Sequence, residues 1–425
     1  MITIQEHQRI NPSQLQSLNY EKLKRRVNYN TSSFVASKIN LIRYEFDPNP
    51  EYEGFWSYFR IGAEWLDTEH TESIIVLPKI QNIDFIEMFM TCLSSSQIED
   101  NFSDIYDIDL DSKPIKSTVL NSILSPLLIV QYLLIVRQIA ERGLRKGYVY
   151  KEENLNKVRG RIDFRKNDIF NVRTAHKERV YCKYNEYSID TPENRYLKRA
   201  LIIAANMISL MEDHKSHSTL LALCNQCLSV FSNVSDTYKD YKFFTRSNKL
   251  FKEYDDALRF AKMIIRKEEM AVNSNRLNFD LVPVFRIDMA LLFEHYVLAK
   301  LRENFGFKNI IYQKKAGNQF IPDFLISKGN LKVIADAKYI LLYENSSYAK
   351  GDYIKQLCGY ARDKRILKSL NIDCDDEDVV PIVPCTLIYP TIENEDTRVY
   401  LLPPEAKKVN YIVKFNTTNI KIPII

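Results

Sequence analysis

Residues 321–340 read IPDFLISKGNLKVIADAKYI and combine the pattern of two β-strands with three charged side chains. The turn sequence KGN at 328–330 separates two apolar runs, so the segment predicts a β-hairpin. Asp323, Asp336 and Lys338 stand where a buried sheet would otherwise carry apolar residues. Because burying an ionised group without a partner is costly, these charges must either pair with one another or bind a metal ion.

Strand periodicity suggests how these charges meet. Side chains alternate faces along a strand, so Asp336 and Lys338 point the same way, and an antiparallel hairpin can bring Asp323 close to Asp336. The helix predicted over 288–305 adds Glu294, an acid within an otherwise apolar stripe. Carboxylate oxygens suit Mg²⁺, and a neighbouring ammonium can hold the attacking water and offset phosphodiester charge. The set outlines a nuclease; the alternative is an internal ion pair between Lys338 and one aspartate.

The next predicted helix, 351–365, adds a polar pair. Gln356 and Tyr360 lie four residues apart and therefore on one helical face, which can present an amide and a phenol to a phosphate backbone. The alternative is an ordinary polar face. The order of the parts, an acidic helix, a charged hairpin and then Q-x-x-x-Y, favours the nuclease interpretation.

In this order the parts resemble the PD-(D/E)XK nuclease superfamily, with Asp336 at the D/E position, and within it the McrC family of modification-dependent restriction subunits. Four stretches carry the resemblance: IIVLPKI (74–80), RGLRKGYVY to VRGRIDF (142–164), DTPENRYLKRAL (190–201) and IPDFLI to DYIKQLCGYA (321–361). The last stretch contains the charged hairpin and is the most diagnostic.

The resemblance implies roles for individual residues. Asp323, Asp336 and Lys338 match the catalytic triad of the family, and Gln356 with Tyr360 matches the Q-x-x-x-Y of RecB-like nucleases. We add Glu294 from the helix as a third metal-binding carboxylate and expect Asp323, Asp336 and Glu294 to bind Mg²⁺.

The resemblance also implies partners. It describes the DNA-cleaving endonuclease subunit of an antiviral restriction system, whose partner McrB is an AAA+ GTPase ring that binds GTP, recognises modified cytosine such as 5-methylcytosine and translocates. The amino-terminal module is then expected to dock on that ring and stimulate its GTPase. Two alternatives stay open: a stand-alone RecB-like nuclease that needs no motor, and a catalytically silent adaptor of an AAA+ ring.

The pattern of elements predicts an α/β fold, α+β overall, in three parts. Short β-like runs predict a β-rich amino-terminal, partner-docking module over 1–110, and helical periodicity predicts a mainly helical middle region over 111–280. Residues 281–425 are expected to form the PD-(D/E)XK restriction-endonuclease-like α/β domain. The β-like runs are 39–46, 55–63 and 73–80, and the helical segments are 116–142, 191–213, 217–232 and 246–268.

Composition limits the classes of protein. The 425 residues are 45% hydrophobic with a formal charge of +5, which permits contact with nucleic acid without requiring it. Seven scattered cysteines and the lack of a secretion signal favour the cytoplasm. The most apolar run, 123–136, is shorter than the ~20 residues that cross a bilayer, so it predicts a buried helix and no membrane partner. The sequence contains no P-loop motif, so GTP would bind to the partner.

Three local features keep two interpretations each. Cys224-x-x-Cys227 predicts two core-facing thiols on a helix rather than half of a zinc site. The basic stretch 142–166 is either a solvated connection, which we favour, or a strand and loop that contacts phosphates or a partner. His295 either approaches Glu294 or faces the other side of its helix, and we expect the second.

Overall fold

The structure is a computed structural model of the 425-residue chain. It describes residues 1–16, 18–27, 40–47, 53–94, 105–109, 112–117, 119–210, 217–237, 252–273, 281–313, 322–340, 351–374, 380–393 and 398–425. The predicted helix start at 246–251 and the predicted strand start at 320–321 lie outside these ranges.

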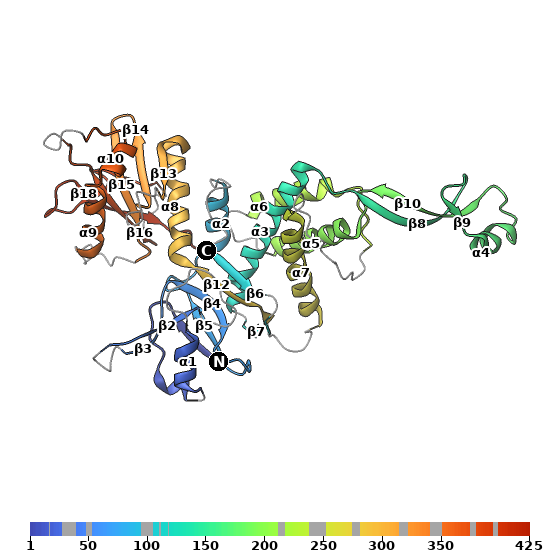
Figure 1. The fold of residues 1–425 in the computed structure, drawn as a ribbon, viewed down its shortest axis with the longest axis horizontal. Helices are drawn as coiled ribbons and strands as arrows, with labels where there is room; N and C mark the ends of the chain where they lie inside the picture. The colour runs from blue at the N-terminus through green and yellow to red at the C-terminus, as the bar shows by residue number, and fades with distance from the viewer. Residues whose placement is uncertain are drawn as a thin grey trace. The chain divides into compact units, whose positions relative to one another are not determined.

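The chain has the mixed α/β fold that the sequence predicts. It divides into two compact units, one formed by Met1–Leu124 with Phe279–Ile425 and the other by Ser125–Asn278. The first unit contains both ends of the chain, and the second contains most of the predicted helical region (Figure 1). The predicted three-part division stays a prediction.

A five-stranded sheet forms the amino-terminal part of the first unit. Its strand order is β1 (Ile2–Gln5), β5 (Ser73–Leu77), β4 (Arg60–Trp65), β12 (Val284–Asp288) and β6 (Tyr106–Asp109). β1 and β5 are parallel, and the other neighbours are antiparallel. Gly62 permits the close approach of β4 to β12, because a Cβ there would collide with the carbonyl oxygen of Phe285. One strand of this sheet, β12, therefore comes from a segment that follows the helical middle region of the sequence.

Smaller elements surround this sheet. β2 (Ile42–Glu45) and β3 (Gly54–Ser57) form a hairpin, and β7 (Ile115–Lys116) pairs with β11 (Leu281–Val282). The helices of this part are α1 (Tyr20–Arg26) and α2 (Phe85–Ser94). The three predicted β-like runs at 39–46, 55–63 and 73–80 all contain strands, as expected.

A six-stranded mixed sheet forms the rest of the first unit. Its order is β13 (Ile310–Tyr312), β14 (Phe324–Lys328), β15 (Leu331–Ala337), β16 (Cys385–Thr391), β18 (Phe415–Lys421) and β17 (Lys407–Lys408). β14 and β15 are the predicted hairpin, and Gly329 has the positive φ of 57° that its tight turn requires. β15, β16 and β18 are parallel.

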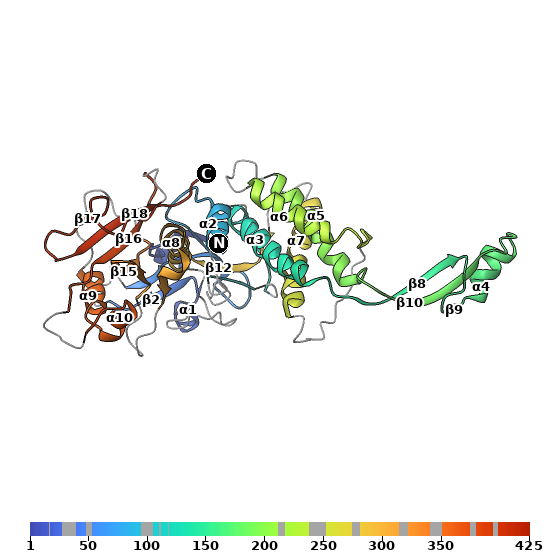
Figure 2. The ribbon, with the colours of Figure 1, turned by 90° about the horizontal axis from the view of Figure 1, so that it is seen from above.

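Helices cover both faces of this sheet (Figures 1 and 2). α8 (Met289–Phe305) lies on one face, while α9 (Gly351–Tyr360) and α10 (Lys364–Ser369) lie on the other. Asp288 caps α8 by accepting a hydrogen bond from the Leu291 amide at 3.1 Å. α8 is buried around most of its circumference, so its apolar residues do not form the single stripe that the sequence predicts.

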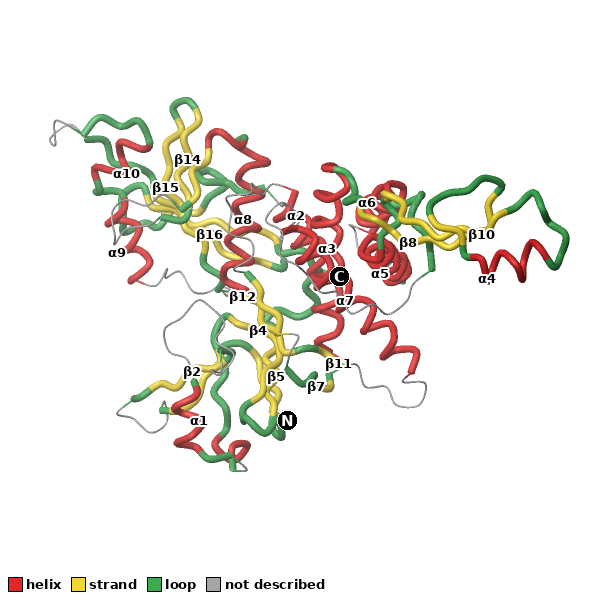
Figure 3. The backbone as a smooth tube through the Cα atoms, turned by 45° about the vertical axis from the view of Figure 1, so that its right-hand side comes forward, coloured by secondary structure: helices red, strands yellow, loops and turns green. Residues whose placement is uncertain are grey.

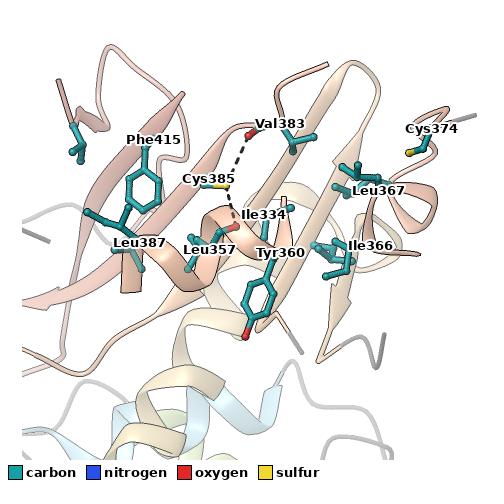
Figure 4. Close-up of a cluster of buried hydrophobic side chains, with 14 of the residues drawn as sticks. Ile334, Leu357, Tyr360, Ile366, Leu367, Cys374, Val383, Cys385, Leu387 and Phe415 are labelled. Carbon is teal, nitrogen blue, oxygen red and sulfur yellow. Dashed lines mark hydrogen bonds between the residues drawn. The ribbon is translucent and has the colours of Figure 1, made fainter. Parts of the chain in front are cut away.

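The core between the sheet and α9 is closely packed. Figure 4 shows Leu357 and Tyr360 of α9 over Ile334 of β15. The Cys385 thiol donates to the carbonyl oxygens of Leu357, at 3.7 Å, and Val383, at 3.8 Å. This packing fixes α9 against β15, the strand that carries Asp336 and leads directly into Lys338.

Helices dominate the second unit. They are most of α3 (Val119–Arg142), α5 (Pro192–Ser209), α6 (His217–Val230) and α7 (Lys252–Asn273) (Figure 3). Within the described residues, α3 alone is long and apolar enough to cross a membrane, over Leu124–Arg142. Since 67% of that window is buried, the helix fits the predicted core role. Cys224 and Cys227 are buried and face backbone carbonyls in this core, which confirms their interpretation as core thiols.

The basic stretch 142–166 forms part of a ribbon that projects from these helices (Figure 2). The ribbon pairs β8 (Gly147–Leu155) with β10 (Val180–Ser188), and β9 (Arg161–Ile162) and α4 (Phe164–Asn167) lie toward its far end. Its cations pair with acids of the same ribbon, among them Lys151 with Glu186 at 2.6 Å, Arg159 with Glu186 at 2.9 Å and Lys183 with Asp163 at 2.7 Å. This internal pairing accounts for many of the basic residues without a phosphate ligand.

Candidate active site

The hairpin β14–β15 brings the two predicted aspartates together. Phe324 pairs with Ala335, so the antiparallel register places Asp323 opposite Asp336 at the open end of the hairpin. Asp323 Oδ2 accepts a hydrogen bond of 2.9 Å from the Ala337 amide, which anchors its carboxylate beside the end of β15. The geometry that the alternation of side chains predicts is therefore present.

Lys338 and Asp336 form a close ion pair through Nζ and Oδ2. The Asp336 side chain is 1% exposed and the Lys338 side chain 20% exposed. The Lys338 ammonium pairs with Asp336 Oδ2, and Asp336 Oδ1 has no hydrogen-bond partner among the described residues. The ammonium also lies 5.3 Å from the ring centroid of Tyr353 on α9. Asp336 is thus a buried carboxylate with unused ligand capacity.

The pKa values of Asp323 and Lys338 show how strongly the charges of this hairpin interact. Burial raises the pKa of Asp323 well above its usual range, and the charges of Glu294 and Asp336 raise it further. Burial alone would lower the pKa of Lys338, but the carboxylates of Asp336 and Asp323 raise it above its usual value. Two adjacent buried carboxyl groups must share either a proton or a cation. At this hairpin the Lys338 ammonium is one such cation, and the raised pKa of Asp323 shows that the negative charges around it still repel one another.

Glu294 approaches this pair from α8, beside the end of β13. Its Oε1 accepts a hydrogen bond of 2.9 Å from Gln313 Nε2, and Tyr312 also hydrogen-bonds to the carboxylate. Burial raises the pKa of Glu294, and the charge of Asp336 raises it further. Across the described residues, no three His, Cys, Asp or Glu side chains gather closely enough to hold a metal ion. Glu294 is thus an electrostatic neighbour of the aspartates and is not assembled with them into a three-ligand cluster.

Gln356 and Tyr360 interact with each other. Gln356 Nε2 donates to the Tyr360 hydroxyl at 2.7 Å, and the Gln356 side chain is exposed on α9. Tyr360 is only 4% exposed because its ring belongs to the core beneath α9 (Figure 4). The sequence predicts that both side chains face outward from α9. In the structure only the Gln356 amide is at the surface, and the buried Tyr360 phenol accepts its hydrogen bond.

Comparison with known families gives one match. The family of McrBC 5-methylcytosine restriction system components matches residues 64–363, which is most of the chain. The chain belongs to this family. The match includes the hairpin aspartates, Lys338, Glu294 and the Gln356–Tyr360 pair, so every predicted site residue of this McrBC component lies within the family region.

Two solved structures are similar to this McrBC component. One is a chain of the refined half-complex from a tetradecameric assembly of Thermococcus gammatolerans McrB AAA+ hexamers with bound McrC, with 14% identity, a TM-score of 0.42 and coverage of 99% of this chain and 94% of that chain. The other is a chain of the Thermococcus gammatolerans McrBC complex, with 15% identity, a TM-score of 0.31 and coverage of 87% and 98%. Both TM-scores are below 0.5, so the family assignment rests on the family match. No curated protein matches the chain.

The site of this McrBC component includes residues that the sequence did not single out. Gln313 and Tyr312 hold the Glu294 carboxylate, and Tyr353 lies beside the Lys338 ammonium. Tyr389 lies on β16, where the parallel register places it beside Lys338, and its buried hydroxyl has no hydrogen-bond partner in the described part of the chain. A single tyrosine or glutamine carries no distinctive signal in the sequence, so only contacts in the folded protein could identify these residues.

His295 is buried on α8 and faces Tyr312. Its Nε2 lies 3.3 Å from the Tyr312 hydroxyl, which also hydrogen-bonds to Glu294. The histidine is therefore connected to the site through one tyrosine, whereas the sequence predicts that it faces away. The Tyr312 hydroxyl thus lies between the His295 ring and the carboxylate of Glu294.

Proposed function

We propose that this McrBC component is the Mg²⁺-dependent DNA endonuclease subunit of a modification-dependent restriction system in the cytoplasm. It would act with an AAA+ GTPase ring of the McrB type, which binds the GTP, and would stimulate that GTPase. The family match supports a place in such a system. The observation that carries the nuclease proposal is Asp336, a 1% exposed carboxylate that lies between Asp323 and Lys338 and whose Oδ1 has no hydrogen-bond partner in the described part of the chain.

The residues fit a hard divalent cation. Asp323 and Asp336 supply adjacent carboxylates, and Mg²⁺ usually retains several waters, so it does not require a third protein carboxylate. Mg²⁺ bound there would neutralise phosphate charge and lower the pKa of a bound water. Glu294, held by Gln313, would contribute through an intervening water.

Lys338 and α9 have complementary tasks in phosphodiester hydrolysis. The water oxygen attacks phosphorus, the bond from phosphorus to the deoxyribose oxygen breaks, and that oxygen takes up a proton. The Lys338 ammonium would hold the water and offset the negative charge that develops on phosphorus-bound oxygens. The exposed amide of Gln356, braced by Tyr360, would donate to a backbone phosphate and position the strand.

A cleavage assay tests the proposal. The Asp336→Ala variant is mixed with the neighbouring-gene partner and with methylated or unmethylated DNA, with and without GTP and Mg²⁺. Wild-type protein should cleave only methylated DNA with partner, GTP and Mg²⁺, and Asp336→Ala should lose at least about 100-fold in rate. Asp352→Ala is the matched control, because Asp352 is an exposed aspartate on α9 that pairs only with Lys355 at 3.5 Å in the described structure. Undiminished cleavage by Asp336→Ala would refute the site assignment, and cleavage without GTP would favour a stand-alone nuclease.

Two observations favour a second function, a catalytically silent adaptor that regulates the ring. The Lys338–Asp336 ion pair already supplies a partner for the buried carboxylate, and the described residues hold no three-ligand cluster. Calorimetric titration with Mg²⁺ and Mn²⁺ separates the two. Heat that disappears in Asp323→Asn supports the nuclease, whereas no saturable binding by wild-type protein supports the adaptor.

A further inference from the structure

β15 ends at Ala337, and Lys338 begins a tight turn directly after it. The Lys338 amide donates to the Ile388 carbonyl at 2.9 Å, and the Ile340 amide donates back to the Lys338 carbonyl at 2.7 Å. This is a three-residue turn with Tyr339 at its centre. Tyr339 is 2% exposed, and its ring centroid lies 5.9 Å from that of Phe293, the neighbour of Glu294 on α8. The position of Tyr339 therefore determines the direction in which the chain leaves Lys338.

Lys79, which follows β5 of the amino-terminal sheet, holds this turn. Its Nζ donates to the Tyr339 carbonyl oxygen at 2.5 Å and lies 3.9 Å from the Tyr339 ring centroid. The same ammonium lies 5.5 Å from the ring centroid of Phe59. One cation thus contacts both the backbone and the ring of the residue next to Lys338, across 260 residues of sequence.

Glu6 completes the contact from β1 and its following turn. Its Oε2 accepts hydrogen bonds from the Lys79 amide at 3.0 Å and from the Tyr339 hydroxyl at 3.4 Å. The residue is 3% exposed, and its Oε1 has no hydrogen-bond partner within the described ranges. Burial raises the pKa of Glu6 to about 7 and lowers the pKa of Lys79 to about 8. Apolar residues of similar volume would be at least as stable at such a place, so stability alone does not explain the buried charges.

We propose that Lys79 and Glu6 are positioning residues for Lys338, holding the Tyr339 turn so that the Lys338 ammonium faces Asp336 and Asp323. This proposal rests on the proposed nuclease function. The contact joins the amino-terminal sheet to the strand that carries the site, so a displacement of β1 or β5 reaches the active site through two side chains. A change in the amino-terminal part would thereby alter the cleavage rate without any contact to DNA.

The experiment uses the full chain assembled with its partner ring, GTP, Mg²⁺ and methylated DNA. Lys79→Met removes the cation and keeps most of the side-chain volume. We expect kcat to fall about 10- to 100-fold, since a misplaced catalytic group costs that much, while KM for DNA changes less than about twofold. Hydrogen exchange at the amides of 338–340 should become faster, and Lys79→Arg should restore most of the rate because a guanidinium can make the same donation.

Lys24→Met is the matched control. Lys24 lies in the same amino-terminal part, and its Nζ is 3.9 Å from the ring centroid of Tyr44, the same distance as in the Lys79–Tyr339 contact. Its loss should leave kcat and the exchange at 338–340 unchanged. If Lys79→Met does not fold because the Glu6 carboxylate loses the nearby positive charge, the double variant Glu6→Gln with Lys79→Met removes both charges and is expected to show the same loss of kcat.

The outcomes separate this inference from the nuclease proposal. Wild-type cleavage rates in Lys79→Met, an equal loss in Lys24→Met, or a loss explained by weaker partner binding would each overturn the positioning role. If the wild-type protein cleaves no DNA under any condition, the nuclease proposal fails. In that case hydrogen exchange still decides the contact, because unchanged exchange at 338–340 in Lys79→Met would show that Lys79 does not hold the turn.

Discussion

Replacing Asp336 by asparagine should separate stability from activity. Three carboxylates, those of Asp323, Asp336 and Glu294, interact with the single Lys338 ammonium in this site. The substitution removes one negative charge from an almost fully buried position and keeps the side-chain volume. If the excess negative charge exists to bind a divalent cation, the metal-free protein should not need it.

The expected size of the effect follows from pairwise charges. At about 4 Å and an effective dielectric constant of about 20, one pair of unit charges interacts by about 4 kcal/mol. Asp336→Asn loses that much attraction to Lys338, but it relieves repulsion from Asp323 and, at longer range, from Glu294. It also relieves the desolvation of a carboxylate that is 1% exposed. In EDTA the free energy of unfolding should therefore stay unchanged or rise, by about 1–3 kcal/mol.

Urea unfolding in EDTA and at increasing Mg²⁺ concentration measures this balance. Mg²⁺ should stabilise the wild-type protein by about 1.4 kcal/mol for each tenfold increase above its dissociation constant, and should leave Asp336→Asn unaffected. The exposed control Asp352→Asn should behave as wild type in both conditions. A loss of about 3 kcal/mol or more for Asp336→Asn in EDTA, with no effect of Mg²⁺ on the wild type, would show that the charges form a structural ion pair.

Three further variants test the interpretation of other buried groups. Burial raises the pKa of Glu64 from 4.5 to about 6, so between these values the folded protein retains a proton that the unfolded chain releases. The free energy of unfolding should therefore fall by about 2 kcal/mol from pH 4 to pH 7. Glu64→Gln should remove this fall in urea titrations. Leu357→Ala should cost about 2–5 kcal/mol in the same titration, because Leu357 lies on the buried face of α9 and is fully buried. Tyr389→Phe should raise the unfolding free energy by about 1 kcal/mol, since its hydroxyl is buried with no hydrogen-bond partner in the described structure; a decrease would contradict that view.

The parts of the fold that depend on local patterns could be predicted from the sequence. The hairpin of β14 and β15 follows from two apolar runs around a turn, and its alternation places Asp336 and Lys338 on one face. The helices of the middle region follow from their periodicity and, for α5, from Thr191, which accepts a hydrogen bond from the Asn194 amide. These signals act within a few residues, so one sequence contains them completely.

Pairings between distant segments could not be predicted in this way. β12 is a strand of only five residues that includes Arg286 and Asp288, and nothing near it in the sequence indicates that it pairs with β4 and β6 of the amino-terminal sheet. The same limit applies to the ribbon, where a basic stretch became one strand of a pair whose acids supply the counter-charges. Register between distant strands depends on the complementarity of whole faces, which a local pattern does not record.

In the candidate site, the sequence identifies the charged residues but not the residues that hold them in place. Asp323, Asp336 and Lys338 were detectable because a charge interrupts an apolar pattern, and burial makes such an interruption costly. For Tyr360 the sequence pattern was a poor guide. Its spacing from Gln356 predicts a shared polar face, but its ring is part of the core. Lys79 belongs to neither group, since a lysine at the end of a strand is ordinary until its ammonium is found on the Tyr339 carbonyl. Supporting residues therefore have to be identified from contacts, and their effect on catalysis has to be tested through the group they hold.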